Sequence, residues 1–127
     1  MQINEISGTI VDSAISIHSA LGPGLLESVY EVLLAHELKQ RGLKVERQVP
    51  VPICYLGIRF EEGYRLDLLV ENLVVVEIKS VEDVLPVHKK QLLTYLRLTG
   101  KPLGLLLNFN QNLMKDGITR IANELKD

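Results

Sequence analysis

One short pattern, residues 67–79, constrains the fold of this chain more than any other stretch. Its second half, residues 74–79, is rich in β-branched side chains, which favour an extended strand. Alternate side chains of a strand point to opposite faces, so Glu77 and Lys79 should share one face of an otherwise apolar strand. A charge in such a place is costly unless it is paired with an opposite charge or a metal ion.

The residues just before this strand determine how it pairs with its neighbour in the sheet. Residues 66–70 are also mostly apolar, and we expect them to pair antiparallel with the strand. If the connecting loop spans residues 71–73, Asp67 lies opposite Glu77, whereas a strict two-residue loop places it opposite Val76 on the other face. We expect the first register, or a bulge with the same result. Two facing carboxylates repel each other, which favours a raised pKa on one of them or a divalent cation between them.

Each of the candidate polar residues also has a plainer interpretation. Glu77 and Lys79 could form an exposed ion pair on an edge strand, since short motifs often match by chance. Glu27 lies near the start of a predicted helix, where an acidic side chain stabilises the helix and needs no further role. His18 lies beside an apolar helical stripe, where a histidine is usually packed or hydrogen-bonded in the core. The residues alone leave these alternatives open.

Length and charge limit the possible functions. The chain has 127 residues, enough for one domain with a sizeable core, and a net charge of −2. It has no general basic field, so binding of nucleic acid would need a local patch. The local basic cluster consists of Lys89, Lys90 and Arg97 on a predicted helix, and such clusters are most often solvated surfaces.

Cysteine usage and hydropathy indicate the compartment. Cys54 is the single cysteine, which excludes an internal disulfide framework and a cysteine-based zinc site. The first residues lack the basic and apolar regions of a signal peptide, and no apolar stretch reaches the ~18 residues of a membrane span. We therefore expect a cytoplasmic protein with no membrane partner.

Hydrophobic periodicity predicts an α/β fold with helices on both sides of a sheet. Pro50 and Pro52 indicate that the first strand lies at an edge or leaves its proline side unpaired, because proline lacks an amide donor. The expected helices span residues 4–21, 25–41 and 86–98, and the expected strands span 44–55, 58–70 with an interruption at 61–63, 74–80, 103–107 and 117–122. The residues expected to supply apolar contacts from the second helix are Leu26, Val29, Leu33 and Leu34.

Several motifs of the chain together resemble those of a known family. Gly24-Leu-Leu-Glu27-Ser-Val-Tyr30 is similar to the signature of the GxxExxY proteins, a group within the PD-(D/E)XK nuclease superfamily. Further segments similar to this group, in the same order, are His18, residues 21–24, 64–67 and 76–79, His88 with Gln91, and residues 95–96 and 104–109. The resemblance implies a single nuclease-like domain over residues 1–127: an αβββαβ core with an extra N-terminal helix and a central mixed sheet flanked by helices.

The resemblance also implies a metal site. According to this resemblance, Asp67 and Glu77 are the metal-binding carboxylates, and the carbonyl of Ile78 is a further oxygen ligand. Glu27 resembles a helix glutamate that reaches the metal directly or through water. Such hard oxygen ligands favour Mg²⁺ or Mn²⁺ over zinc.

Two further roles follow from the same resemblance. Lys79 corresponds to a lysine that orients or activates the attacking water, or stabilises the charge of the phosphate. Gln91 corresponds to a glutamine that positions this lysine and the solvent. Together these roles imply a metal-dependent nuclease acting on nucleic acid, DNA more than RNA.

Two other functions remain compatible with the sequence. The chain could be a non-catalytic domain that keeps the fold and binds nucleic acid or protein, because a fold does not determine an activity. It could also be an accessory subunit whose partner binds the substrate. A homodimer is plausible, but no sequence feature decides the oligomeric state.

Overall fold

The computed structural model describes residues 1–124, apart from the side chain of residue 62. Its elements are α1 (Ile3–Leu21), α2 (Glu27–Gln40), β1 (Val45–Tyr55), β2 (Ile58–Val70), β3 (Val74–Lys79), α3 (Pro86–Thr99), β4 (Leu103–Asn108), the 3₁₀ helix η1 (Met114–Gly117) and β5 (Ile118–Ala122). The predicted order of elements is therefore confirmed, and η1 is an addition that the sequence pattern did not indicate.

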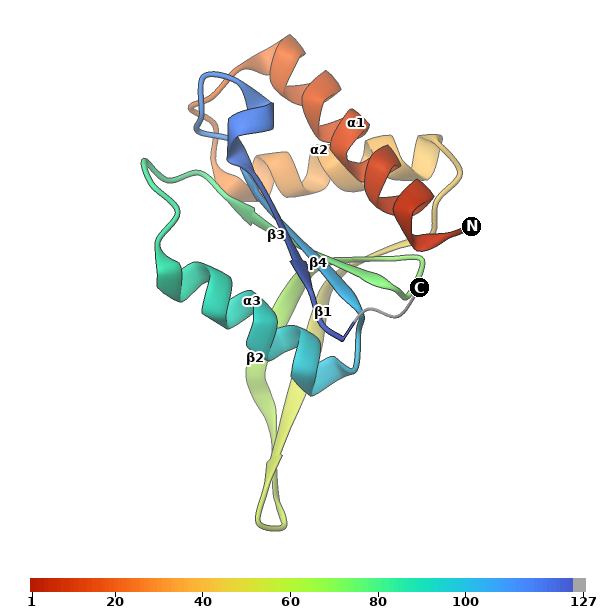
Figure 1. Cartoon of the computed structure of the whole chain (residues 1–127), viewed down its shortest axis with the longest axis vertical. Helices are drawn as coiled ribbons and strands as arrows, with labels where there is room; N and C mark the ends of the chain where they lie inside the picture. Colours follow the sequence, from red (N-terminus) through yellow and green to blue (C-terminus); the bar gives the residue numbers. More distant parts are fainter. Residues whose placement is uncertain (125–127) are drawn as a thin grey trace.

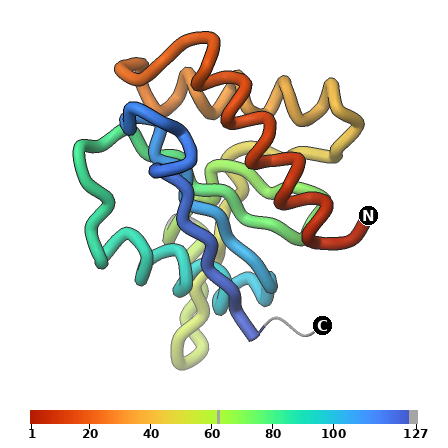
Figure 2. The backbone as a smooth tube through the Cα atoms, turned by 45° about the horizontal axis from the view of Figure 1, so that its top comes forward, coloured from red at the N-terminus to blue at the C-terminus, as the bar shows by residue number. Residues whose placement is uncertain are grey.

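The strands form one five-stranded sheet in the order β1-β2-β3-β4-β5. Strands β3 and β4 are parallel and are joined through α3, while the other neighbours are antiparallel. Helices α1 and α2 cover one face of the sheet and α3 covers the other (Figures 1 and 2). The predicted fold class, a central mixed sheet flanked by helices, is confirmed.

Two apolar cores lie on the two faces of this sheet. The larger core packs the helices α1 and α2 against one face and includes Val76 and Ile78 of β3. The smaller core packs Leu92 of α3 against the other face and includes Val75. Because side chains alternate along a strand, Glu77 extends from β3 on the same face as Val75. The two cores thus fix which side of the sheet the candidate carboxylate occupies.

The inward face of α2 differs from the prediction. Leu34 is buried as expected, but Leu26 is 73% exposed and Val29 also lies outside the core. The residues of α2 that are buried are Tyr30, Glu31, Leu34, Ala35 and Leu38. Apolar residues occur on two faces of α2, so periodicity could not choose between them.

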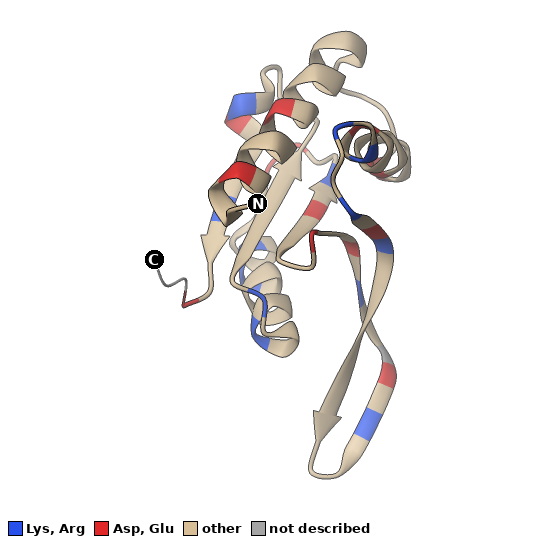
Figure 3. Ribbon diagram, turned by 90° about the vertical axis from the view of Figure 1, so that its right-hand side faces the viewer, with Lys and Arg blue, Asp and Glu red and all other residues tan. Residues whose placement is uncertain are grey.

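The hairpin of β1 and β2 extends beyond the rest of the sheet. Strand β1 is an edge strand, as its two prolines predicted, and its register with β2 shifts between Val51 and Ile53. Beyond this shift, residues 53–63 project from the body as a two-stranded ribbon that we call the arm (Figures 1 and 3). Strand β2 is continuous through residues 61–63, but these residues have no partners in the β1 ladder, so the predicted interruption is a break in the pairing and not in the strand. Gly63 instead lies against Ile53, whose Cδ1 would be 2.6 Å from an added Cβ.

None of the helices in the described part of the chain is both long and apolar enough to cross a membrane.

Candidate functional site

The register of the β2–β3 hairpin brings the two predicted carboxylates together. Leu68 pairs with Val76, and continuing this antiparallel register by one residue places Asp67 opposite Glu77. The expected three-residue loop is therefore confirmed, and the two-residue alternative is excluded.

The loop conformation explains why this register forms. Glu71 and Asn72 both adopt the left-handed region, with φ of 52° and 56°. The amide of Leu73 then donates a hydrogen bond of 3.0 Å to the carbonyl of Val70 and closes the turn. The Glu71 carboxylate accepts a 2.6 Å hydrogen bond from the amide of Lys44, which anchors an otherwise unfavourable conformation.

Each carboxylate is held by a backbone amide of the neighbouring strand. The amide of Ile78 donates a 2.8 Å hydrogen bond to Oδ2 of Asp67, and the amide of Asp67 donates one of 3.3 Å to Oε1 of Glu77. Glu77 is only 8% exposed, and its strand lies between β2 and β4 inside the sheet. The interpretation of Glu77 and Lys79 as an exposed edge-strand pair is therefore wrong.

The environment raises the pKa of both carboxyl groups. Burial is the largest cause for Glu77, followed by the nearby charge of Asp67, and together they raise its pKa to about 8. Burial is also the largest cause of the raised pKa of Asp67. The Ile78 amide opposes that rise, while the charges of Glu31 and Glu27 add to it. The pair is therefore poorly neutralised by the protein itself, which is the situation that a bound cation relieves.

Lys79 is the cationic neighbour of this pair. It ends β3 two residues after Glu77 and is half-buried. Its positive charge lowers the pKa of both Asp67 and Glu77, so the ammonium lies within electrostatic reach of both. Among the described residues, Lys79 nevertheless forms no ion pair within 4 Å. Its charge is thus available to an anionic ligand beside the carboxylates.

The backbone of Ile78 supplies one more oxygen on the same side. The amide of Ile78 points towards β2, because it donates to Asp67. The amide and carbonyl of one strand residue face the same neighbouring strand, so the carbonyl of Ile78 also faces β2. The ladder between β2 and β3 includes no residue of β3 beyond Val76. This carbonyl therefore lies on the carboxylate side of β3.

The Gly24–Tyr30 segment shapes the start of α2. Gly24 has a φ of 105°, a conformation that side chains rarely adopt. The hydroxyl of Tyr30 donates a 2.6 Å hydrogen bond to the carbonyl of Gly22 and accepts one of 3.2 Å from the amide of Leu25. Its ring stacks on Phe109 with centroids 4.3 Å apart. The glycine and the tyrosine thus fix the turn from which Glu27 emerges.

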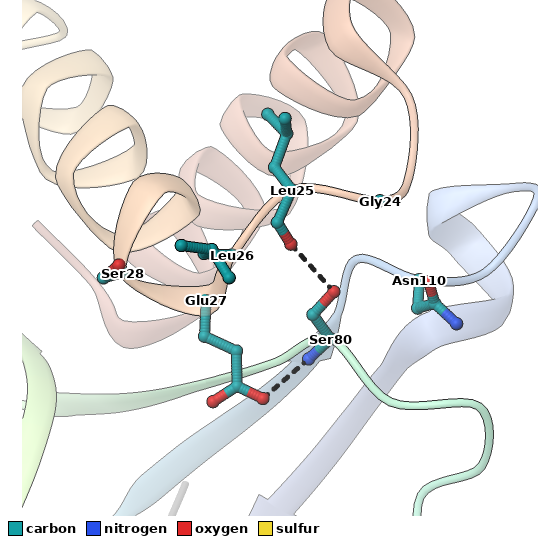
Figure 4. A pocket seen from close by; sticks show the side chains of 7 residues that line it. All are labelled: Gly24, Leu25, Leu26, Glu27, Ser28, Ser80 and Asn110. Carbon is teal, nitrogen blue, oxygen red and sulfur yellow. Dashed lines mark hydrogen bonds between the residues drawn. The ribbon is translucent and has the colours of Figure 1, made fainter.

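Glu27 joins this turn to the end of β3. It is the first residue of α2, and its Oε2 accepts a 3.0 Å hydrogen bond from the amide of Ser80 (Figure 4). The hydroxyl of Ser80 donates a 3.1 Å bond back to the carbonyl of Leu25. A cleft of about 580 Å³ opens here and reaches across to Asn110, but Asp67 and Glu77 do not line it. Glu27 therefore lines the cleft, and its charge also acts on Asp67.

The donor set fits a hard divalent cation only in part. Asp67, Glu77 and the carbonyl of Ile78 offer oxygen alone, which suits Mg²⁺ or Mn²⁺. Within residues 1–124, no group of three or more His, Cys, Asp and Glu side chains is close enough to hold a metal ion. The structure thus brings two carboxylates together and leaves Glu27 bound to Ser80, so contact of Glu27 with a metal stays a prediction.

The remaining predicted polar residues lie outside the pair. Gln91 is exposed on α3, and no hydrogen bond joins it to Lys79 in the described residues, so its positioning role also stays a prediction. His88 caps α3 by accepting a 3.0 Å hydrogen bond from the amide of Leu85. His18 is buried and donates a 2.7 Å bond to the carbonyl of Gln111, as the core interpretation expected.

Sequence reasoning missed a buried network beside Asp67. Glu31 is one turn after Glu27 and buried, and its Oε2 accepts hydrogen bonds of 2.9 and 3.2 Å from Arg47 of β1. Its Oε1 accepts one of 2.7 Å from Gln48, which has a left-handed φ of 53°. A signal was present: Glu31 shares the helical stripe of Glu27, and a buried glutamate requires a partner.

A second missed residue holds the segment that follows Lys79. Asn108 is fully buried at the end of β4. Its side chain accepts a 3.1 Å hydrogen bond from the amide of Val81 and donates one of 2.9 Å to the carbonyl of the same residue. This arrangement fixes the backbone next to Ser80 and hence the contact with Glu27. The only signal in the sequence was a polar residue directly after a buried strand.

The model of the PD-(D/E)XK nuclease superfamily matches residues 4–121. The chain belongs to this superfamily. No curated protein and no solved structure matches it significantly. Membership of a nuclease superfamily suggests a nuclease-like function with nucleic acid as ligand, and nucleases of this superfamily generally use divalent metals.

Proposed function

We propose that this superfamily member is a metal-dependent nuclease that hydrolyses phosphodiester bonds in nucleic acid, with DNA favoured over RNA. One observation carries the proposal. The β2–β3 hairpin brings the carboxylates of Asp67 and Glu77 together in a largely buried place, with Lys79 following on the same face of β3. Two carboxyl groups and a lysine so placed are costly to bury, and the two amide hydrogen bonds offset only part of that cost.

Asp67, Glu77 and the carbonyl of Ile78 would hold Mg²⁺ or Mn²⁺. When bound there, the cation would polarise the phosphate and lower the pKa of water. The amides that hold Asp67 and Glu77 orient both carboxylates before any ligand arrives. Lys79 would place its ammonium where negative charge develops on the phosphate.

We further infer that the chain is a GxxExxY protein. The geometry of Gly24, Glu27 and Tyr30 supports this inference, because each signature residue has a distinct task at the start of α2. Gly24 supplies the positive φ, Tyr30 closes the turn, and Glu27 reaches the backbone after β3. A signature that holds Glu27 next to the carboxylate pair is consistent with a metal-linked role for this glutamate. The single, exposed Cys54 is compatible with a reducing cytoplasm.

The decisive experiment is a cleavage screen over single-stranded, duplex and branched DNA and RNA. Each substrate is incubated with Mg²⁺, Mn²⁺ or a chelator. We expect wild-type cleavage that requires the cation, and a loss of more than about 100-fold in Glu77→Gln and Asp67→Asn. Glu46→Gln is the matched control, because Glu46 is an exposed glutamate of the same sheet. Titration calorimetry with Mn²⁺ should show weaker binding in the first two variants alone.

Substitution of Lys79 separates catalysis from binding. Lys79→Ala should abolish cleavage while leaving Mn²⁺ binding intact, and Lys39→Ala, an exposed lysine of α2, should change neither. If wild-type protein binds Mn²⁺ and nucleic acid but cleaves no substrate, the nuclease proposal is wrong. The chain would then be a binding domain or an accessory subunit that retains the fold.

A further inference from the structure

The arm exposes an unusual amount of apolar surface. Five large side chains on or beside it are exposed, with Leu56 at 84% and Phe60 at 55%; the others are Tyr55, Ile58 and Tyr64. Together they offer roughly 500 Å² of side-chain area, against about 800 Å² per partner in a standard interface. An isolated two-stranded hairpin is at best marginally stable in water. The arm therefore presents most of one side of an interface.

The charge of the arm argues against nucleic acid as its partner. Residues 53–63 contain one arginine and two glutamates. Binding to a phosphate backbone relies on an excess of positive charge, which this segment lacks. The basic cluster of Lys89, Lys90 and Arg97 lies on α3 instead (Figure 3). A protein surface is the occupant that the composition of the arm favours.

The backbone edge of the arm is open on one side. Strand β3 pairs with β2 through Leu68–Val70, so the described residues provide no strand beside the outer edge of residues 58–66. The outer edge of β1 differs, because Pro50 and Pro52 remove amide donors from it. The open edge of β2 carries no proline and is therefore the edge able to accept another strand.

We propose that a second copy of this chain pairs with the open edge of β2, antiparallel and about a two-fold axis at Phe60. The charges of Arg59 and Glu61 are self-complementary about this point. In this register Arg59 lies opposite Glu61 of the second copy, and Glu61 lies opposite its Arg59. On the other face the two Phe60 rings meet. Such pairing is isologous and closed, as two-fold dimers require.

Within one chain, Arg59 and Glu61 already pair along the strand and both are largely exposed. An exposed pair of this kind contributes little to the stability of a single chain. Across a dimer, however, the same two side chains form two symmetric cross-strand pairs, which specify the register. The dimer does not depend on nuclease activity and would carry two copies of the carboxylate pair.

Charge reversal in two separate chains tests the register. Arg59→Glu and Glu61→Arg should each weaken self-association roughly tenfold or more, because like charges then face each other. Mixing the two variants should restore a heterodimer of wild-type affinity, since every facing pair becomes complementary. Analytical ultracentrifugation measures both effects, and circular dichroism confirms folding. A monomeric wild type at micromolar concentration, or a mixture that fails to associate, would overturn the proposal.

Disulfide trapping provides an independent measurement. In a Cys54→Ser background, Phe60→Cys should give a disulfide-linked dimer under mild oxidation, because facing residues of an antiparallel pair lie about 4.5–5.5 Å apart. Wild-type Cys54 is the matched control. Cys54 lies on β1 and pairs with Arg59 of β2, so the two Cys54 residues would be separated by three strand spacings and a two-residue offset, about 16 Å, and should not link. Efficient linkage through Cys54, or none through position 60, contradicts the proposed register.

Discussion

The two halves of β2 have similar alternating sequences and very different surroundings. The inner half, up to Val70, pairs with strands on both sides, buries Leu68 completely and carries Asp67. Within the described part of the chain, the outer half, from Ile58 to Gly63, pairs with β1 alone and exposes its large side chains. Alternation specifies that a segment is a strand, but the neighbouring elements decide which half contributes to the core.

This contrast separates two environments along one strand. In the inner half, partial burial raises the pKa of Asp67. In the outer half the side chains are available for contact with another molecule. Substitutions in the two halves should therefore affect different measurable properties.

The largest expected difference between the halves is in the free energy of unfolding. Leu68→Ala removes a fully buried side chain and should destabilise the protein by about 3 kcal/mol. Phe60→Ala removes a larger side chain from the arm, yet it should leave the stability of the isolated chain nearly unchanged. Urea unfolding of both variants, in an Arg59→Glu background that keeps the chains apart, measures the difference. Equal losses in the two variants would show that the arm packs on the body.

A smaller effect concerns pH. The pKa of Glu77 is raised to about 8 in the folded protein, so at intermediate pH the folded state holds a proton that the unfolded state has released. Raising the pH removes this proton and favours unfolding. The metal-free protein should therefore lose stability steadily as the pH rises from about 5 to about 8. Urea unfolding at four pH values in the presence of a chelator measures the slope.

Two comparisons show whether this slope arises from the carboxylate pair. Glu77→Gln should flatten it, because the amide does not titrate, whereas Glu46→Gln on the surface of β1 should keep it. Mn²⁺ should stabilise the wild type more at pH 8 than at pH 5, since it competes with the proton for the same oxygens. An unchanged slope in Glu77→Gln would mean that other groups cause the pH dependence.

Local patterns predicted the order of elements along the chain, the edge position of β1 and the hairpin register. Each of these depends on neighbouring residues: alternation within a strand, Pro50 and Pro52 on one edge, and a loop of fixed length. The facing of Asp67 and Glu77 was predictable for the same reason, because loop length and alternation fix it together.

Features that depend on distant contacts were not predictable. Glu27 meets the amide of Ser80, which is 53 residues further along the chain. No local rule chooses this contact over any other partner for an acidic residue at a helix start. The prediction of the buried face of α2 was wrong for a related reason. Leu26 and Leu34 are equally apolar, and only the position of the sheet decides which of them is buried. Gly63 suggested an interruption of the strand, whereas it lies in a continuous strand at an irregularity of the pairing and close to Ile53.

The smallest expected effect compares two ion pairs, one at each end of the β1–β2 hairpin. Glu31 is buried and is held by Arg47 and Gln48, so Glu31→Gln should cost about 1–2 kcal/mol as charged hydrogen bonds are lost. Glu61→Gln in the arm removes an exposed pair with Arg59 and should leave the unfolding midpoint of the single chain unchanged. Urea unfolding of dilute protein measures both. If Glu61→Gln destabilises the single chain as much as Glu31→Gln, the arm is a structural element of the monomer, and its exposed side chains need no second copy.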